Sequence, residues 1–405
     1  MALKPIESEK KFKELVEETK KIKHYRDPIG FGIARVDRGQ LNRDKILQAT
    51  FPVINWKENY GSAAVFVAAL KDAGVDVDFK KSEFVCDVKK KFIKNAFNLF
   101  NPYLKEALGD KHKNVQVIRT LFSICQADSL EDNYKLVFIF DDSEPKSVES
   151  SYLKLYALSE GKAPLRSLNL SGIFKVLENV AWSMNVPIEL EWLRANEIEL
   201  KIDGMFPVIN SIDKFPRLLQ HVIPGENVRV LDATKVRMGA YLAPGTTIMP
   251  GASYVNFNAG TTGAVMVEGR VSSSVIVGEG SDVGGGASIL GVLSGTNGNP
   301  ISIGKNTLLG ANSVTGIPLG DGCIVDAGVA ILEGTKVTIA AKDLKEIVKI
   351  NPDFKYTQTE DVNGYIIKGL ELAGINGVHF RQDSTSGKIK AVRSTREVVL
   401  NSDLH

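Results

Sequence analysis

The sequence predicts an α/β amino-terminal domain, a left-handed parallel β-helix built from hexapeptide repeats, and a small carboxy-terminal β/α extension. Two observations in the middle of the chain carry this prediction: a six-residue spacing of aliphatic residues and a concentration of glycine. Of the 36 glycines in 405 residues, 21 fall between Gly239 and Gly334. This segment therefore differs in kind from the rest of the chain.

Within this segment, aliphatic residues recur at every sixth position, in runs that are interrupted twice. The recurring positions are Val236, Leu242 and Ile248; Val271, Val277, Val283 and Ile289; Ile303 and Leu309; and Leu319, Val325, Ile331 and Val337. A period of six fits neither an α-helix nor the alternation of a strand, and it is typical of a hexapeptide-repeat β-helix. About 18 residues then complete one coil of a triangular prism. The interruptions at 260–271 and 290–301 predict loops that leave the prism, and such loops often carry sites.

The flanking segments predict ordinary secondary structure. Upstream, Lys135–Phe140 has the composition of a buried strand. Amphipathic periodicity predicts helices at 9–24, 62–73, 90–108 and 168–184. Downstream we expect a helix at 341–350 and a hairpin of strands 377–382 and 388–393. With the Ile223-Pro224-Gly225 turn before the prism, the expected domains are residues 1–225, 226–340 and 341–405.

The composition excludes several classes of function. The 50 Lys and Arg residues nearly balance the 48 Asp and Glu residues, and no basic run exceeds Lys89–Lys91, so no nucleic-acid partner is expected. No apolar run approaches the ~20 residues that span a bilayer, and the first residues lack a signal-peptide core, so no membrane association and a cytoplasmic location are expected. Cys86, Cys125 and Cys323 are far apart in the sequence and are expected to be reduced and buried.

The histidines point to a carboxylate as the acid/base group of the prism. All five lie outside 236–337: His24, His112, His221, His379 and His405. This placement argues against a zinc site held by histidines on the prism. It leaves general base chemistry there to Asp or Glu. The candidates are Glu268, Glu279, Asp282, Asp321, Asp326 and Glu333.

Glu268 stands out because it lies at an interruption of the repeat, with Arg270 two residues later. On an extended segment these side chains project to the same side, so the guanidinium could hold a substrate carboxylate beside Glu268. The alternative is an ion pair at the rim of little consequence. Asp282 and Asp321 suit turn formation at corners, and Asp326 stays open between a corner residue and a site residue.

Three consecutive glycines, Gly284–Gly286, also have two interpretations. They lack the Lys-Ser/Thr ending of a phosphate-binding P-loop. Either they let an extended ligand such as a pantetheine arm approach the backbone, or they only form a tight corner.

Several longer motifs carry a family resemblance. They are Arg237–Thr247, Val255–Thr261, Met266–Arg270, Gly280–Ser288, Ile301–Gly304 and Leu308–Asn312. With them the chain resembles the tetrahydrodipicolinate N-succinyltransferases of the hexapeptide-repeat acyltransferase superfamily. The resemblance resumes at Ile367–Gly374 and Phe380-Arg381, and includes the tail Leu400–His405.

The resemblance implies transfer of a succinyl group from succinyl-CoA to the amine of ring-opened tetrahydrodipicolinate, in lysine and diaminopimelate biosynthesis. It implies a homotrimer with active sites between neighbouring prisms, small-molecule substrates, and no permanently bound cofactor. The family's catalytic glutamate matches Glu268, as an acyl-anhydride nucleophile or as a base. The acyl-CoA and substrate contacts match Arg270, Gly285, Ser288, Ala311, Asp326, Ala327, Gly334, Lys368, Arg381, Gln382, Asp383 and Ser384.

The chain departs from the family pattern at some positions. Lys235 and Ala252 stand where related enzymes carry acidic residues that bind magnesium, so no magnesium is expected. The segment Arg381–Ser384 is less basic than in the family, which predicts different phosphate recognition. The segment between Val337 and Ile367 is an insertion with no assigned role. Two other functions stay open: an acetyl-CoA-dependent N-acetyltransferase, and a non-catalytic trimeric scaffold that would tolerate replacement of Glu268.

Overall fold

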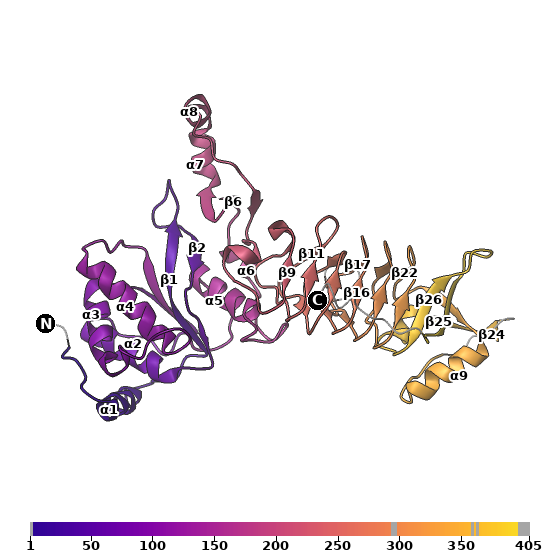
Figure 1. Cartoon of the computed structure of the whole chain (residues 1–405), viewed down its shortest axis with the longest axis horizontal. Helices are drawn as coiled ribbons and strands as arrows, with labels where there is room; N and C mark the ends of the chain where they lie inside the picture. The colour runs from indigo at the N-terminus through magenta and orange to yellow at the C-terminus, as the bar shows by residue number, and fades with distance from the viewer. Residues whose placement is uncertain (1–2, 293–297, 358–359, 362–363, 396–405) are drawn as a thin grey trace. The chain divides into compact units, whose positions relative to one another are not determined.

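A computed structural model describes most of the chain as two compact units (Figure 1). The described residues are 3–292, 298–357, 360–361 and 364–395. Unit 1 comprises Met1–Ala157 and Leu168–Pro216, and unit 2 comprises Leu158–Ser167 and Arg217–His405. The three-part division into 1–225, 226–340 and 341–405 stays a prediction, and the tail Leu400–His405 lies outside the described residues.

Unit 1 is built on an antiparallel sheet in the order β2-β1-β5-β4, with β3 paired to β1. The strands are β1 (Gly30–Arg38), β2 (Ile46–Thr50), β3 (Asn55–Trp56), β4 (Glu83–Asp87) and β5 (Tyr134–Ile139). The predicted strand at 135–140 is confirmed as β5. Its Leu136, Val137 and Phe138 are fully buried, as the apolar run requires.

The helices of unit 1 bury an aromatic core against this sheet. They are α1 (Glu9–Lys20), α2 (Tyr60–Asp72), α3 (Lys90–Leu99) and α4 (Lys113–Gln126), and α5 (Val148–Ser159) follows β5. Phe66 of α2 packs against Phe31, Phe92 and Phe100. The predicted helices at 9–24, 62–73 and 90–108 are thus confirmed in position, although two of them end early. The third stops before Pro102, whose missing N–H cannot continue the ladder, and a short 3₁₀ turn follows.

The helix predicted at 168–184 is wrong. Only α6 (Ile173–Val176) is helical there, and β6 (Val180–Ser183) is a strand. It joins β7 (Val186–Glu189) and β8 (Ser211–Asp213) in an antiparallel sheet of order β7-β6-β8. The apolar residues of this segment have a helical spacing, but the burial of Ala181 and Trp182 in the sheet stabilises the strand instead.

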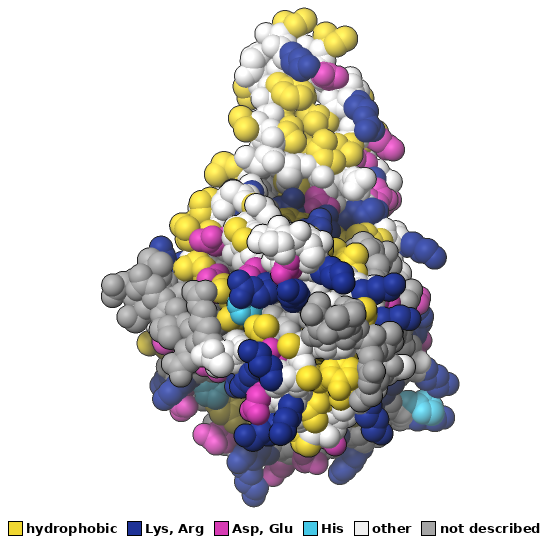
Figure 2. Space-filling view, turned by 90° about the vertical axis from the view of Figure 1, so that its right-hand side faces the viewer, with side chains coloured by type: hydrophobic (Ala, Val, Ile, Leu, Met, Phe, Trp, Pro, Cys, Tyr) yellow, Lys and Arg dark blue, Asp and Glu magenta, His cyan; other side chains and the backbone are white. Residues whose placement is uncertain are grey.

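This small sheet carries an arm formed by α7 (Leu190–Ala195) and α8 (Glu197–Ile202). Figure 2 shows yellow hydrophobic side chains exposed on it. On the arm and the segment that follows it, Ile198, Ile202, Met205 and Val208 are more than 70% exposed. Exposed apolar side chains gathered in this way are typical of an interaction surface.

Unit 2 is a parallel β-helix, in agreement with the six-residue spacing. Its two-residue strands stack in three columns, which form the faces of a prism (Figure 1). The first face contains β9 (Arg229–Val230), β10 (Thr247–Ile248), β13 (Met266–Val267), β16 (Asp282–Val283), β19 (Leu308–Leu309) and β21 (Ile324–Val325). The second contains β11 (Tyr254–Val255), β14 (Arg270–Val271), β17 (Ser288–Ile289), β20 (Val314–Thr315) and β22 (Ala330–Ile331). The third contains β12 (Gly260–Thr261), β15 (Ile276–Val277) and β18 (Ser302–Ile303).

The interior of the prism contains a stack of aliphatic residues, which includes predicted positions. On the first face, the predicted Val283, Leu309 and Val325 pair in register with Val267, which falls in the predicted interruption, and all four are at most 1% exposed. Each coil has three faces, and each face points one aliphatic residue inward. Neighbouring faces are about six residues apart in the sequence, which explains the six-residue period.

Several coils are shorter than the three full hexapeptides that the sequence predicted. Tyr254 pairs with Arg270, and Leu308 pairs with Ile324, so neither spacing reaches the length of three hexapeptides. The predicted loop at 260–271 is wrong, because β12, β13 and β14 all remain in the prism and only the corner between β13 and β14 is shortened. At 290–301 the chain does lengthen, since Ser288 pairs with Val314, more than three hexapeptides further on. Residues 293–297 of this segment lie outside the described residues.

The carboxy-terminal segment extends the first face. It contains β23 (Lys336–Ile339), α9 (Ala341–Ile350), β24 (Glu360–Asp361), β25 (Gly364–Lys368), β26 (Val378–Gln382) and β27 (Ile389–Arg393). The predicted helix and hairpin are confirmed, since β26 and β27 pair antiparallel. β26 also pairs in parallel with β21, so it supplies a further strand of the first face.

Two further expectations can be compared with the structure. All three cysteines are free, and Cys125 and Cys323 are buried, but Cys86 is only half-buried on the edge strand β4. Within the described residues, no helix is both long and apolar enough to cross a membrane.

Candidate active site on one edge of the β-helix

Most of the predicted site residues lie along one edge of the prism, where the first face turns into the second. We call this the site edge; it consists of the corners 268–269, 284–287, 310–313 and 326–329, stacked coil on coil. Glu268, Gly285, Ala311, Asp326 and Ala327 belong to these corners. Arg270 and Ser288 pair in register at the start of the second-face strands.

Glu268 occupies the shortest of these corners. Only Glu268 and Gly269 separate β13 from β14, whereas each of the next three corners is twice as long. Glu268 N–H donates to Val283 O (2.8 Å), and Gly286 N–H donates to Glu268 O (3.3 Å). A Cβ at Gly269 would lie 2.3 Å from Ala287 O, so only glycine fits there. Glu268 is half-buried in this short corner, near Gly285 of the next corner.

The three glycines of the next corner have different reasons to be glycine. A Cβ at Gly284 would lie 2.6 Å from Leu309 O, and Gly286 has a φ of +71°, so both are required by the fold. Gly285 has neither constraint: its nearest described neighbour would be Glu268 Oε2, at 3.6 Å from an added Cβ. The tight-corner interpretation thus accounts for Gly284 and Gly286, and leaves Gly285 as the position where backbone is open to a ligand.

Arg270 lies close to Glu268 in sequence but bonds elsewhere. Its guanidinium donates from Nε and Nη2 to Ser288 Oγ, at 3.1 and 2.6 Å. Within the described part of the chain no ion pair joins it to Glu268, so the rim ion pair considered for these two residues does not form. The exposed Arg270 keeps its remaining N–H groups for another partner.

A column of unused backbone donors follows the site edge. Among the described residues, the amides of Gly285, Ala311 and Ala327 have no acceptor, although the residues around them are bonded between coils. These three amides occupy equivalent positions in successive corners, which parallel strands space by about 4.8 Å. The edge thus offers evenly spaced donors beside a carboxylate.

A histidine does reach the prism, although none lies within 236–337. His379 belongs to β26, which pairs with β21, and its Nε2 lies 2.7 Å from Asp326 Oδ1. Arg381 Nε lies 3.8 Å from the other oxygen, Asp326 Oδ2. Asp326 is therefore approached on both sides. Sequence reasoning missed this contact because His379 lies far along the chain from Asp326, on a strand outside the repeat.

The remaining predicted residues lie apart from the Glu268 corner. Lys368 pairs with Lys336, and Gly369 and Leu370 donate to Thr335 O and Glu333 O, which places Lys368 beside the corner that contains Gly334. This corner follows the second face, so it is a different edge of the prism. Among the described residues, nothing lies within 4 Å of a Cβ added at Gly334. In a single chain the predicted residues therefore form two groups.

Gln382, Asp383 and Ser384 end β26 and begin the hairpin turn. Asp383 Oδ1 accepts from Thr385 Oγ1 (2.6 Å), Ser386 N (2.8 Å) and Ser386 Oγ (2.8 Å), and Lys390 also contacts its carboxylate. The bonds from Lys390 and from Thr385 and Ser386 hold the pKa of Asp383 well below its usual range. The carboxylate is thus engaged in the turn, whereas Gln382 and Ser384 are exposed.

Two of the other charged positions have structural partners. Asp321 Oδ1 accepts from Lys305 N (2.7 Å), which agrees with its predicted role at a corner. Lys235 Nζ donates to Gly251 O at 2.7 Å. The described residues contain no group of three His, Cys, Asp or Glu side chains that could hold a metal ion.

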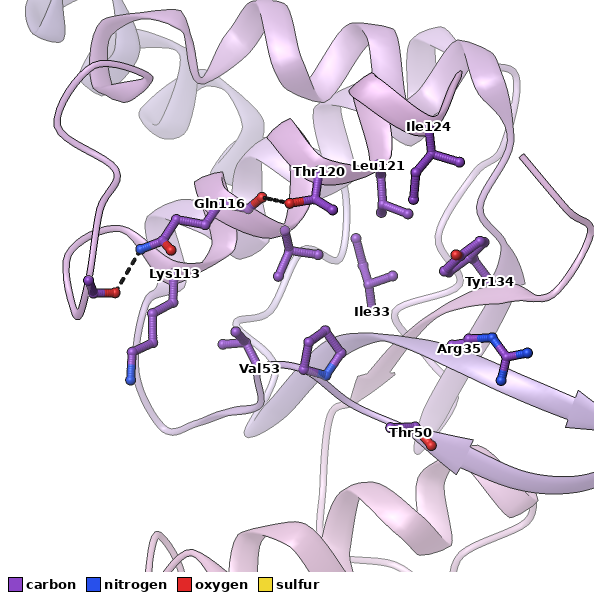
Figure 3. A pocket seen from close by; sticks show the side chains of 13 residues that line it. Ile33, Arg35, Thr50, Val53, Lys113, Gln116, Thr120, Leu121, Ile124 and Tyr134 are labelled. Carbon is purple, nitrogen blue, oxygen red and sulfur yellow. Dashed lines mark hydrogen bonds between the residues drawn. The ribbon is translucent and has the colours of Figure 1, made fainter. Parts of the chain in front are cut away.

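Unit 1 contains a separate cavity of about 520 Å³ (Figure 3). It lies between α4 and the sheet, with Ile33, Val53 and Leu121 in its apolar lining and Arg35 and Lys113 at its ends. None of the described residues that line it is a carboxylate, a histidine or a cysteine. It therefore lacks a carboxylate of the kind that Glu268 provides at the site edge.

Comparison with known proteins decides the family. The chain is 62% identical, over 405 residues and the full length of both chains, to a 2,3,4,5-tetrahydropyridine-2,6-dicarboxylate N-succinyltransferase from Sulfurovum sp. (strain NBC37-1). The chain belongs to the tetrahydrodipicolinate N-succinyltransferase family. The relative of the same name from Helicobacter pylori is 53% identical, with 98% of this chain and 99% of that protein covered.

Family models and a solved structure agree with this assignment. The N-terminal and middle models of tetrahydrodipicolinate N-succinyltransferase match residues 10–175 and 177–217, and the model of the hexapeptide repeat of succinyl-transferase matches 300–333. A crystal structure described as a putative 2,3,4,5-tetrahydropyridine-2-carboxylate N-succinyltransferase from Campylobacter jejuni superposes with a TM-score of 0.89. It is 55% identical and covers 97% of this chain and 99% of its own. The arm and the sheet of unit 1 are thus as much family features as the prism.

Proposed function

We propose that this protein transfers the succinyl group of succinyl-CoA to the amine of tetrahydrodipicolinate. With one water the products are N-succinyl-2-amino-6-oxopimelate and free CoA, and the reaction is a step of lysine and diaminopimelate biosynthesis. The observation that carries the proposal is the half-buried Glu268 carboxylate near the open side of Gly285, in a chain whose relatives bear the name of this reaction. The acyl donor of the proposal, succinyl-CoA, has one close alternative, acetyl-CoA. No described residue of the site edge measures the acyl length, so acetyl-CoA is the comparison that an experiment must include.

Glu268 supplies the chemistry by one of two routes. As a base it takes the proton of the attacking amine while the amine nitrogen bonds the thioester carbonyl carbon, and the C–S bond then breaks to release CoA. As a nucleophile its carboxylate first displaces CoA thiolate, which leaves an acyl anhydride that the amine then opens. In both routes negative charge develops on the thioester oxygen, and the Gly285 amide beside Glu268 is the donor that would stabilise it. One such donor contributes on the order of 10²- to 10³-fold in rate.

The site edge also suits an extended donor. The amides of Ala311 and Ala327 continue the column of backbone donors away from Glu268, as the amide carbonyls of a pantetheine arm require. Arg270 would bind a carboxylate, either of the acceptor or of the succinyl group, with the N–H groups that do not bond Ser288. Lys368 and Arg381, both exposed, are the cations assigned to the CoA phosphates. Gln382, Asp383 and Ser384 complete this group through their backbone or exposed side chains.

The active form in this proposal is a cytoplasmic homotrimer of left-handed prisms. A trimer would join the site edge of one subunit with the Gly334 and Lys368 corner of its neighbour, which accounts for the two groups found in one chain. The exposed apolar side chains of Ile198, Ile202 and Val208 favour burial in such an assembly. The donor is a co-substrate, and no magnesium is proposed at Lys235 and Ala252, because neither side chain offers an oxygen ligand.

The test is release of CoA from succinyl-CoA and from acetyl-CoA, each with and without tetrahydrodipicolinate. We expect acceptor-dependent release that favours succinyl-CoA and falls at least 100-fold in Glu268→Gln. Glu279→Gln, which removes another exposed carboxylate of the prism that faces Lys305, is the matched control and should be unaffected. Preference for acetyl-CoA would overturn the named substrate. Absence of release with either donor would overturn the proposed reaction and favour a non-catalytic scaffold.

A further inference from the structure

We propose that His379 is a positioning residue that fixes the Asp326 carboxylate for binding of the acyl-CoA donor. This inference rests on the proposed function and deepens it, since His379 lies outside the repeat and is not among the predicted contacts. It assigns to the carboxy-terminal hairpin a role in donor affinity rather than in the acyl-transfer step.

The geometry comes from a strand that the hexapeptide repeat does not contain. β26 pairs with β21 so that His379 lies opposite Ile324 and Phe380 opposite Val325. Asp326 directly follows Val325 at its corner, and the His379 ring reaches it with Nε2 at 2.7 Å from Oδ1. A hydrogen bond to a carboxylate is stronger than a neutral one, and it holds one rotamer of an otherwise mobile corner side chain.

The second carboxylate oxygen faces a cation. Arg381 Nε lies 3.8 Å from Asp326 Oδ2, and Arg381 is more exposed than either partner, at 55% against 39% for Asp326 and 22% for His379. The less exposed histidine therefore holds one oxygen while the other lies toward the exposed guanidinium. Without the histidine, the Asp326 carboxylate would be free to rotate, and it would no longer orient the Arg381 guanidinium.

Asp326 and His379 lie some distance along the site edge from Glu268, the residue that acts in the proposed reaction. Glu268 follows Val267 and Asp326 follows Val325, and Val283 and Leu309 lie between these two in the ladder. Three strand spacings of about 4.8 Å place the two corners about 14 Å apart. Asp326 and the Ala327 amide next to it are thus too far from Glu268 to touch the thioester, but they lie on the same edge as the donor's path. A change at His379 should alter donor binding and leave the reaction of bound donor unchanged.

The experiment compares His379→Phe, which removes the hydrogen bond, with His379→Gln, which keeps a donor near the position of Nε2. Succinyl-CoA saturation and binding of CoA itself are measured by steady-state kinetics and calorimetry, with thermal melting to confirm folding. For His379→Phe we expect the KM for succinyl-CoA and the Kd for CoA to rise about tenfold, with kcat within about twofold. For His379→Gln we expect most of the affinity to return.

Two controls make the result specific. His112→Asn removes a histidine of unit 1 that also lies near a carboxylate, Glu106, at a backbone φ of +52° that suits asparagine, and should change neither constant. In an Asp326→Ala background, His379→Phe should have no further effect, because the carboxylate that it positions is gone. An unchanged KM in a folded His379→Phe protein, or a fall in kcat alone, overturns the proposal. If the wild type itself neither binds CoA nor releases it, the proposed function fails instead, so the two failures are distinguishable.

Discussion

Glu268 Oε2 is the described atom nearest to the open side of Gly285, one coil further along the same edge: it would lie 3.6 Å from a Cβ added at Gly285. The corner at Glu268 is half as long as the corner at Gly285. A side chain at Gly285 would meet nothing in the described chain closer than this oxygen. The space is therefore open to the group on which Glu268 acts in the proposed reaction.

This relationship predicts opposite outcomes for two neighbouring glycines. Gly285→Ala should fold with a melting temperature close to that of the wild type, yet lose at least tenfold in kcat/KM, because the methyl group occupies the path of the thioester. Gly284→Ala should instead be destabilised by about 1–3 kcal/mol, because its Cβ would lie 2.6 Å from Leu309 O. Thermal melts and kinetics of both variants are the measurement. Full activity of Gly285→Ala would show that no ligand approaches this backbone.

A second prediction concerns Arg270. Ser288→Ala removes the acceptor of two guanidinium hydrogen bonds and frees Arg270 to rotate. We expect kcat/KM to fall about three- to tenfold, which corresponds to one hydrogen bond of typical strength. The kcat/KM of Arg270→Lys should fall further, because an ammonium group lacks the planar fork of N–H groups with which a guanidinium can bond both Ser288 and a carboxylate. Ser123→Ala in helix α4 is the control, and equal activity of all three variants would contradict a role for the Arg270–Ser288 pair.

The proposed trimer predicts complementation between inactive variants. Gly334→Trp should fold, because no described atom lies within 4 Å of an added Cβ, but should block the neighbour's site edge. Co-expression of differently tagged Glu268→Gln and Gly334→Trp chains should give mixed trimers with about a third of wild-type activity, since each site needs one intact edge and one intact corner from different subunits and a mixed trimer contains one such site of three. Mixed trimers that purify with both tags but show no activity would place each site within a single chain.

The prism was predictable from the sequence because its signal is repeated. Each coil places an aliphatic residue inward at the same three positions, so Val283, Leu309 and Val325 each indicate the same fold. Unit 1 carries no such repetition. There the pairing of β6 with β7 and β8 determined the structure of 180–183 against its helical spacing, and helices α4 and α5 were not predicted.

The parts of the candidate site that depend on local sequence were predictable. The contact that depends on pairing of distant strands was not. Glu268 and Gly285 follow from an interruption of the repeat and from a glycine run. The Asp326–His379 contact depends on a strand that returns to the prism after α9 and β25, and no local pattern encodes which strand it will join. The insertion between Val337 and Ile367 includes α9 and leads into β25, and β26 follows it and extends the first face.

His221 predicts how the stability of the protein depends on pH. Burial lowers the pKa of His221 from 6.5 to about 4, because the charged imidazolium is disfavoured away from water. Below pH 6.5 the unfolded chain takes up a proton here that the folded chain does not. The free energy of unfolding is therefore unaffected by protonation of His221 above about pH 6.5. It decreases as the pH falls toward 4, by up to about 3 kcal/mol.

The measurement is the free energy of unfolding of wild type and His221→Leu between pH 7 and pH 4. The variant has no imidazole to protonate, so its stability should fall less over this range, by about the amount assigned to His221. His24→Asn is the control, because His24 is exposed and its backbone φ of +64° suits asparagine. Parallel pH profiles for wild type and His221→Leu would mean that His221 is protonated as readily in the folded protein as in the unfolded chain, and that its burial carries no energetic cost.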